Sequence, residues 1–322
     1  MRNLAIGCLV IVLFVPYALF AQFRAGDQAY YVTGSSGRAY DVTTPTNYNP
    51  SKEYPVVFEL HGMGFSRGYI HDNDSYESRQ KVVDELQYIS IRPEAEVAKV
   101  KFIFSKSLDI KVWNSWGITN QKPIVLPDDV DYIKTVYDQV RGIMGASFNP
   151  DKVYIYGFSN GGAMAMKMIQ QTHLFKAATI HSMSLLKGKS PSVNMVKIPI
   201  MFIHGTADTY VPYYGGSPTN NDVPAILRPF IKFMPIKETV DLWAKNYNLN
   251  YKFEAEYEAN DYFSRNFYYR EYTHPTHPIY FFVSKDTYHV SDAGFDIDNV
   301  RRAFVRFFSN PSKFGIYKNV SS

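Results

Sequence analysis

Apolar and polar residues follow two different periods along this chain. Short aliphatic and aromatic runs, typical of buried strands, alternate with longer segments in which apolar residues recur at helical spacing. The strand runs lie at 55–60, 101–105, 153–156, 177–181, 199–204 and 279–284. The helical segments lie near 75–88, 126–144, 160–171, 237–247 and 297–308. Strands alternating with helices predict an α/β fold, with a mostly parallel sheet and helices on both of its faces.

Two segments depart from this alternation. QAYYVT at 28–33 and RAYDVT at 38–43 are short aromatic and β-branched runs joined by GSSG at 34–37, which predicts an N-terminal antiparallel hairpin. Tyrosine-rich residues at 251–270 predict further β structure. Because no repeat or low-complexity tract interrupts the chain, we expect a single domain over residues 22–322.

The first 21 residues form an apolar run with one early arginine, which predicts a secretory signal peptide cleaved after Ala21. The mature protein is then secreted or periplasmic, without stable insertion in a membrane. Pro16 and the small Ala21 favour cleavage over the alternative of an uncleaved anchor. The one cysteine, Cys8, lies inside this run, so a cleaved chain cannot form a disulfide.

Composition excludes some classes of function. The chain has 322 residues, of which 46% are hydrophobic and 16% aromatic, enough for one large core. Its net charge of +4 is spread along the sequence without a cluster of lysines and arginines. A nucleic-acid partner is therefore not expected.

A candidate nucleophile lies in the segment 152–171, where a strand pattern, a sharp turn and a helix follow one another. GFSNG at 157–161 has the form G-x-S-x-G, and AMAMKMIQQ at 163–171 consists of strong helix formers. Strand, G-x-S-x-G and helix together are typical of a nucleophile elbow, in which the serine Oγ is exposed above a helix N-terminus. The pattern makes Ser159 the candidate nucleophile.

The expected order of such a catalytic triad is serine, acid, histidine. Asp208 lies in HGTAD, directly after the strand at 199–204, although the alternative of an ordinary turn aspartate stays open for it alone. His289 lies between the strand at 279–284 and the last helix. His274 and His277 precede that strand and are better explained as exposed loop residues. We therefore predict a triad of Ser159, Asp208 and His289, with His289 as the base.

The tetrahedral intermediate of an acyl transfer needs preorganised N–H donors for its oxyanion. The residue after the nucleophile, Asn160, is expected to supply one backbone N–H. The second is expected from HGMG at 61–64, after the strand at 55–60, with Met63 as the first candidate and Gly64 as the alternative.

Several motifs resemble those of one enzyme family. HGMG at 61–64, YGFSNGG at 156–162 and HGTADTYVPY at 204–213 are similar to motifs of secreted polyhydroxybutyrate depolymerases and their relatives. These relatives include the feruloyl and acetylxylan esterases of carbohydrate esterase family one. GRAYDVTTP at 37–45 and FNPDKVYIYG at 148–157 extend the resemblance over most of the mature chain. It implies an α/β-hydrolase fold and hydrolysis of esters.

The residues around the candidate triad suggest where substrate binds. Ligands of open α/β sheets bind at the carboxyl ends of the strands, so Gly64, Trp113 and Trp116 are candidate substrate-binding residues. The two tryptophans are either a stacking wall or local packing. The segment 214–236, with a polar arm and an apolar part broken by prolines, is either a lid or a surface excursion.

These observations favour a secreted serine esterase that acts on polymer-linked esters, such as feruloyl or acetyl esters of plant cell-wall polysaccharide. Three alternatives remain: a polyhydroxyalkanoate depolymerase, a peptidase similar to prolyl oligopeptidase, and a hydrolase scaffold that only binds. The first three of these four functions use the same serine chemistry. No metal and no organic cofactor is expected, and the expected partner is a polymeric or oligomeric ester.

Overall fold

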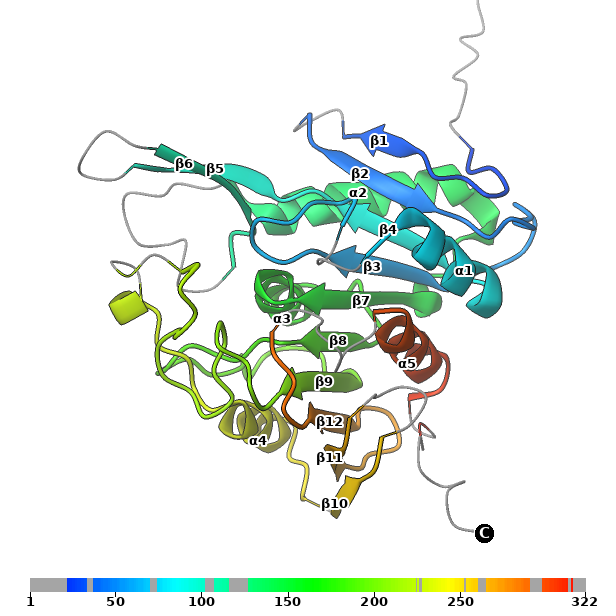
Figure 1. Cartoon of the computed structure of the whole chain (residues 1–322). Coiled ribbons are helices and arrows are strands. Elements are labelled where there is room, and N and C mark those ends of the chain that lie inside the picture. Colours follow the sequence, from blue (N-terminus) through cyan, green and yellow to red (C-terminus); the bar gives the residue numbers. More distant parts are fainter. Residues whose placement is uncertain are drawn as a thin grey trace, which may run out of the picture.

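The computed structural model describes residues 22–33, 37–69, 74–101, 107–115, 127–223, 225, 228–251, 253–259, 265–289, 297–311 and 314. The predicted signal peptide at 1–21 lies outside this part of the chain. Within it a sheet of ten strands has the order β1-β2-β4-β3-β7-β8-β9-β12-β11-β10 (Figure 1). In the described residues no helix combines the length and the apolar character that crossing a bilayer requires.

The middle of the sheet is parallel and its two sides are antiparallel. The strands β4, β3, β7, β8, β9 and β12 run parallel, whereas β1 and β2 on one side and β11 and β10 on the other are antiparallel to their neighbours. Their bounds are β1 Tyr30–Val32, β2 Ala39–Thr43, β3 Val56–Leu60, β4 Ile89–Pro93, β7 Val153–Phe158, β8 Ala178–His181, β9 Ile200–Gly205, β10 Phe253–Tyr257, β11 Phe267–Tyr272 and β12 Ile279–Ser284. This arrangement confirms the predicted mostly parallel sheet with its N-terminal hairpin.

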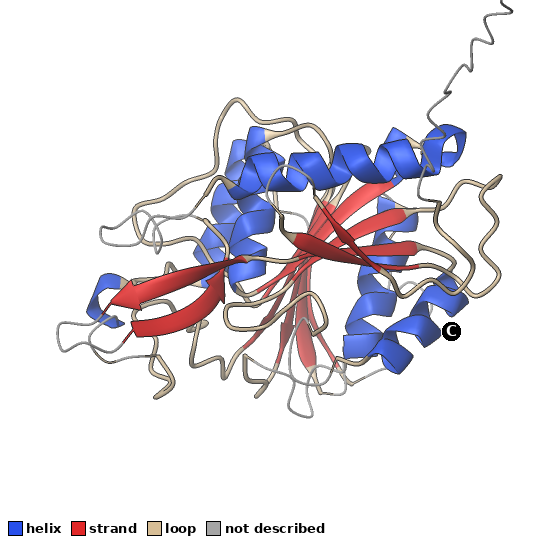
Figure 2. Cartoon of the chain, turned by 90° about the horizontal axis from the view of Figure 1, so that it is seen from above, coloured by secondary structure: helices blue, strands red, loops and turns tan. Residues whose placement is uncertain are grey.

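Helices cover both faces of the sheet (Figure 2). They are α1 Tyr76–Leu86, α2 Asp129–Met144, α3 Asn160–Gln171, α4 Ile236–Asn246 and α5 Ile297–Ser309. Because successive strand residues point to opposite faces, β7 feeds two cores: Val153 and Ile155 join the core under α2, α3 and α4, and Tyr156 joins the core under α1 and α5. Each helix presents an apolar face to one of these cores, as the helical spacing predicts.

The strand predicted at 101–105 lies, apart from Lys101, outside the described part of the chain. The strand that follows α1 is β4 (Ile89–Pro93), which the apolar pattern does not predict. The strand β4 lacks a clean apolar pattern because it carries Ser90 and Arg92, both of them buried. An arginine can be buried in a strand only when a carboxylate pairs with it, and the partner here, Asp74, comes from a distant segment.

The described residues between β4 and Trp113 form two further strands that the apolar pattern does not predict. Glu96–Lys101 (β5) and Ser107–Val112 (β6) form an antiparallel hairpin that pairs with no other described strand. Figure 1 shows it projecting from the body of the molecule at the upper left. The hairpin leads directly into Trp113, and so it connects to the middle of the fold.

Five buried charges lie between the sheet and the helices α1 and α5. Asp74 accepts from Arg92 Nη2 at 2.6 Å and from Arg301 Nη2 at 2.7 Å, and Arg301 Nε lies 3.4 Å from Glu59 Oε2. Arg79 Nη1 lies 3.7 Å from Asp74 as well. Burial alone lowers the pKa of Arg301, but Asp74 and Glu59 raise it above its ordinary value. Asp74 therefore lies next to three buried arginines, and together with Glu59 it offsets part of their positive charge.

We expect Asp74→Asn to destabilise the fold by about 3–5 kcal/mol, because it leaves buried arginine charges without compensation. The free energy of unfolding, measured by urea denaturation, checks this. Asp131→Asn is the matched control, since Asp131 is exposed and pairs only with Lys134 on the surface of α2. Equal losses in the two variants would show that the buried cluster does not depend on Asp74.

Candidate active site

The turn after β7 places Ser159 in a backbone conformation that non-glycine residues rarely adopt, with φ of 52° and ψ of −121°. Two backbone hydrogen bonds hold it there. Ser159 N–H donates to His181 O at 2.8 Å, and Ser159 O accepts from Ala163 N–H at 3.1 Å. Strained backbone of this kind is typical of functional sites, because the surrounding structure must enforce it.

The glycines on either side of Ser159 are required by space. A Cβ on Gly157 would lie 2.2 Å from the carbonyl oxygen of Gly161. A Cβ on Gly161 would lie 2.2 Å from the carbonyl oxygen of Leu60, at the end of β3. The turn, the start of α3 and the end of β3 therefore touch through their backbones, with no room for a side chain between them.

The three residues of the predicted triad form one hydrogen-bonded row. Ser159 Oγ lies 2.8 Å from His289 Nε2, and His289 Nδ1 lies 2.7 Å from Asp208 Oδ2. Because the carboxylate can only accept, the ring proton belongs on Nδ1, and Nε2 is then free to accept from the serine hydroxyl. This arrangement can pass the serine proton to the imidazole.

The carboxylate of Asp208 is buried and accepts hydrogen bonds from several neighbouring groups. Its Oδ1 accepts from the backbone N–H groups of Tyr210 at 2.9 Å and Val211 at 2.8 Å. His204 Nε2 lies 2.8 Å from Val211 O and 3.4 Å from Asp208 Oδ2. Burial lowers the pKa of His204 and outweighs the opposite effect of Asp208. The imidazole of His204 thus joins the backbone at Val211 and lies beside the carboxylate of Asp208.

Two aromatic rings border the imidazole of His289. The Phe158 ring lies 5.1 Å from it at an interplanar angle of 41°, and the Tyr210 ring lies 5.0 Å away at 33°. The motifs around Ser159 and Asp208 contain both residues, but nothing in those motifs shows that their rings meet at His289. The rings limit how far the imidazole can turn out of the row.

The candidate oxyanion donors lie where α3 begins and where β3 ends. Asn160 is the first residue of α3, and its side chain accepts from Trp113 N–H at 2.7 Å and donates to Ser115 Oγ at 2.8 Å. Its backbone N–H is thus held next to Ser159. Gly64 is a poor donor, because its N–H already donates to Lys111 O at 2.8 Å. For Met63 N–H the described residues provide no such acceptor, so Met63 remains the better candidate.

Trp113 is not a stacking wall for substrate. Its side chain is fully buried, its Nε1–H donates to His61 O at 2.9 Å, and its ring packs against the His61 ring at 5.2 Å. The tryptophan instead fixes the loop after β3 and, through its backbone, the side chain of Asn160. Trp116, the other predicted wall residue, lies outside the described residues.

A hollow of about 660 Å³ lies between the hairpin β5–β6 and the loop after β3. Gly64, one of the predicted substrate-binding residues, lines it. The exposed side chains of Tyr69 and Val97 face the solvent from its walls. Phe65 lines the hollow too and contacts Phe158, the residue before Ser159, with ring centroids 6.3 Å apart. The hollow therefore lies beside a ring that packs against the residue before Ser159.

The segment 214–236 is attached to the loop that carries Asp208. Thr209 O accepts from the N–H groups of Thr219 and Asn220, and the Tyr210 hydroxyl donates to Asp222. At its other end, Met234 N–H donates to Leu185 O at 2.8 Å, and Ser184 Oγ donates to Met234 O at 2.6 Å. The predicted lid is thus tied to the body at both ends, and its movement stays a prediction.

Among the described residues, no group of three or more histidine, cysteine, aspartate or glutamate side chains is arranged to hold a metal ion. The row of Ser159, His289 and Asp208 has the geometry that proton transfer and nucleophilic attack by a serine require.

Known proteins similar to this chain in sequence are described as esterases. A family model described as phospholipase/carboxylesterase matches residues 50–228. The candidate esterase NocK of Nocardia uniformis subsp. tsuyamanensis is 32% identical over 177 residues, which are 53% of this chain and 45% of that protein. Feruloyl esterase C of Emericella nidulans is 24% identical over 182 residues, which are 56% of this chain and 58% of that protein. The matched part thus spans about half the length of these curated relatives.

Solved structures share the fold. The feruloyl esterase module of Clostridium thermocellum, complexed with sinapinate, has a TM-score of 0.50 and 14% identity, over 94% of this chain and 93% of that chain. Porphyromonas gingivalis dipeptidyl peptidase 4 has a TM-score of 0.51 and 9% identity, over 89% of this chain and 36% of that chain. At these identities the likeness concerns the fold alone, which is that of the α/β-hydrolases.

We expect Gly161→Ala to abolish correct assembly of the elbow, because the added Cβ meets the backbone of Leu60 at 2.2 Å and no side chain can move aside. The measurement is the yield of soluble protein together with its melting temperature. Gly142→Ala in α2 is the control: its Cβ meets nothing within 4 Å, and alanine is the better helix former by roughly 0.5–1 kcal/mol. If both variants melt like the parent protein, the close backbone approach at Gly161 is wrong.

Proposed function

The chain belongs to the phospholipase/carboxylesterase family, and from this premise we propose that it is a secreted serine esterase acting on polymer-linked esters. The observation that carries the proposal is the hydrogen-bonded row of Ser159, His289 and Asp208, with the serine on a strained turn at the N-terminus of α3. A strained serine in reach of an oriented imidazole is the arrangement that nucleophilic catalysis needs.

The proposed reaction proceeds in two halves. Ser159 Oγ attacks the ester carbonyl carbon while His289 Nε2 takes the hydroxyl proton. The tetrahedral oxyanion is stabilised by the backbone N–H groups of Asn160 and Met63. When the intermediate collapses, the carbon–oxygen bond of the ester breaks and the imidazolium gives its proton to the leaving alcohol. Water then attacks the acyl-enzyme by the same route, which releases the acid and restores Ser159.

The surroundings of His289 support its role as the base. Asp208 stabilises the imidazolium that forms during attack, and it is itself held by two backbone N–H groups. The rings of Phe158 and Tyr210 keep the imidazole in line with Ser159. The reaction as proposed uses only groups of the protein, with no metal or organic cofactor.

Two observations favour a large substrate with an aromatic or acetyl acyl group. The hollow beside the hairpin β5–β6, which Gly64 lines, would give a large substrate room that a small ester does not need. Feruloyl esterase C of Emericella nidulans is 24% identical to this chain over 182 residues. We therefore place feruloyl or acetyl esters of plant cell-wall polysaccharide first among the substrates.

Secretion is part of the proposal and rests on the sequence of residues 1–21. The run is apolar, starts with a single positive charge and ends in a small residue, as signal peptides do. An extracellular location also matches the substrate, because a cell-wall polysaccharide is too large to enter a cell. The partner of the enzyme is then its polymeric or oligomeric ester.

We expect Ser159→Ala to lower hydrolysis of p-nitrophenyl acetate by a factor on the order of 10⁴ or more, because no acyl-enzyme can form. The same variant should lose covalent labelling by a fluorophosphonate probe, which mass spectrometry detects as a single adduct on the parent protein. His289→Ala should lose as much activity as Ser159→Ala.

The control for these variants is His274→Ala, which removes a half-buried imidazole, stacked on that of His277, from the turn before β12 and should leave activity unchanged. Near-parental activity of a folded Ser159→Ala variant, or a larger loss in His274→Ala than in His289→Ala, would refute the proposed triad. Polyhydroxybutyrate granules, assayed in parallel with methyl ferulate and acetylated xylan, show whether the alternative polymer is the better substrate.

We expect Tyr69→Ala to change selectivity more than chemistry. Tyr69 is 52% exposed and lines the hollow beside the hairpin, so its ring is available to a bulky substrate and irrelevant to a small one. The loss of one such contact is worth roughly 1 kcal/mol, or several-fold in kcat/KM on a feruloylated arabinoxylan oligosaccharide. The rate on p-nitrophenyl acetate should stay within a factor of two.

The matched control for Tyr69→Ala is Phe253→Ala, which removes an exposed aromatic ring from the opposite side of the sheet. The quantity compared is the ratio of the two rates in variants of equal melting temperature. An unchanged ratio in Tyr69→Ala would show that this hollow does not hold the substrate.

A further inference from the structure

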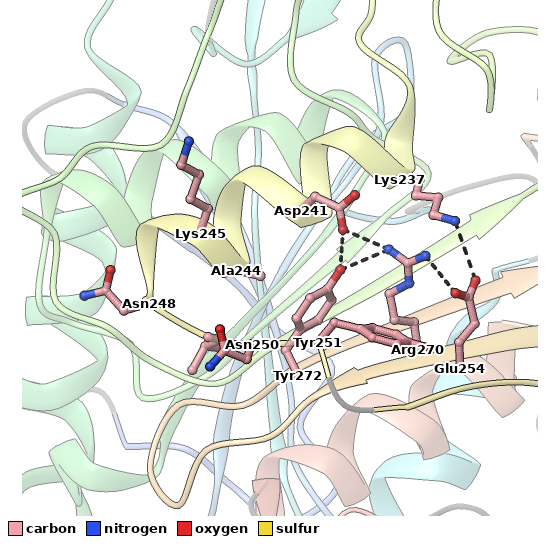
Figure 3. Close-up of a pocket in the computed structure, with 11 residues that line it drawn as sticks. Lys237, Asp241, Ala244, Lys245, Asn248, Asn250, Tyr251, Glu254, Arg270 and Tyr272 are labelled. Carbon is pink, nitrogen blue, oxygen red and sulfur yellow. Dashed lines mark hydrogen bonds and ion pairs between the residues drawn. The ribbon is translucent and has the colours of Figure 1, made fainter.

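A second hollow, of about 700 Å³, lies far along the sheet from Ser159. Its walls are one face of α4, the loop at 248–251, and the strands β10 and β11 (Figure 3). The strand β10 is the edge of the sheet, and β8, β9, β12 and β11 separate it from β7, which carries Ser159. The proposed esterase reaction uses none of the residues in this hollow.

A buried arginine organises the polar groups of the hollow. Arg270 Nη1 donates to Asp241 Oδ1 at 2.8 Å and to the Tyr272 hydroxyl at 3.0 Å, and Nη2 donates to Glu254 Oε2 at 2.8 Å. Figure 3 shows Asp241 and Glu254 on opposite sides of the guanidinium. Both carboxylates remain partly exposed, so they can accept further hydrogen bonds from a ligand.

One wall of the hollow is a tyrosine ring in a fixed orientation. The Arg270 guanidinium lies over the Tyr251 ring at 5.3 Å, and the Tyr272 ring meets it edge to face at 6.1 Å and 73°. Even so, 53% of Tyr251 is exposed. An aromatic surface that is both held by its neighbours and open to solvent binds an apolar ring face at little entropic cost.

The charges of the hollow argue against an ionic ligand. Asp241 and Glu254 already face Arg270, and Lys237 Nζ lies 3.8 Å from Glu254 Oε1, so both signs of charge occur along the wall, to which Lys245 also contributes. Neither a phosphate nor a cation finds charges of one sign concentrated here. The polar groups that can bind a neutral ligand are the carboxylates and the side-chain amides of Asn248 and Asn250. These groups suit the hydroxyl groups of a ligand.

We propose that this hollow is a binding site for a neutral oligosaccharide. A sugar ring lies against Tyr251, and its hydroxyl groups donate to Asp241 and Glu254 and bind the amide of Asn250. Paired carboxylates held by a guanidinium, next to an aromatic ring, match the vicinal hydroxyls and the apolar C–H face of a sugar. The site goes beyond the proposed esterase activity, because it binds the polysaccharide without acting on it.

The test is isothermal titration calorimetry of xylohexaose into the Ser159→Ala protein, whose inactive nucleophile removes any contribution from turnover. We expect Tyr251→Ala in this background to weaken binding at least five-fold, and Asp241→Asn to weaken it as well. Phe253→Ala is the matched control, since Phe253 is an exposed aromatic residue on the same strand pair whose ring packs on Tyr269, outside the hollow. It should bind xylohexaose like the parent.

The outcomes separate this site from the esterase proposal. In the chain with Ser159 intact, Tyr251→Ala should hydrolyse p-nitrophenyl acetate at the parental rate, whatever the oligosaccharide result. Binding that is absent, or equal in Tyr251→Ala and the parent, overturns the sugar site without affecting the triad. Stronger binding of oligogalacturonate than of xylohexaose overturns the neutral ligand class. A Tyr251→Phe variant that retains binding shows that the ring face, and not the hydroxyl, makes the contact.

Discussion

The site depends on the contact between three backbone segments: the end of β3, the elbow after β7 and the first turn of α3. At Gly157 and Gly161 these segments approach so closely that a single methyl group would overlap a carbonyl oxygen. This contact fixes the strained conformation of Ser159 and brings the loop at 61–64 beside it. The position of the serine Oγ is therefore set by backbone packing, which is stiffer than any arrangement of side chains.

The side chain of Asn160 connects this rigid backbone contact to the residues that follow β6. Its side chain holds Trp113 and Ser115, and the buried ring of Trp113 holds His61 in turn. The loop that supplies a candidate oxyanion donor is thus attached to the nucleophile from two directions, through β3 and through Trp113. Preorganised donors stabilise an oxyanion without having to move during the reaction. In the proposed mechanism, this double attachment therefore lowers the barrier by holding the donor loop in place.

The sequence alone predicts those features that depend on the local pattern of apolar residues and on the order of motifs along the chain. The central strands, the elbow and the spacing of Ser159, Asp208 and His289 all follow from runs of apolar residues and the residues that end them. The strand β4 could not be found this way, because Arg92 looks exposed until Asp74 is known to lie beside it. Trp113 was ambiguous for a similar reason, since a tryptophan after a strand suits both a buried and a ligand-facing position. Such features depend on contacts between distant segments, which no local period encodes.

Two segments that we propose to border the substrate are attached to this centre in different ways. The hairpin β5–β6 pairs only with itself among the described strands and contacts the loop after β3 through Lys111 O and Gly64 N–H. The segment 214–236 reaches the acid loop through Tyr210, whose ring also lies against His289. Changes in the hairpin can therefore alter which ester fits without disturbing the triad. The segment 214–236 is different, because Tyr210 connects it directly to the base, and its changes should affect selectivity and rate together.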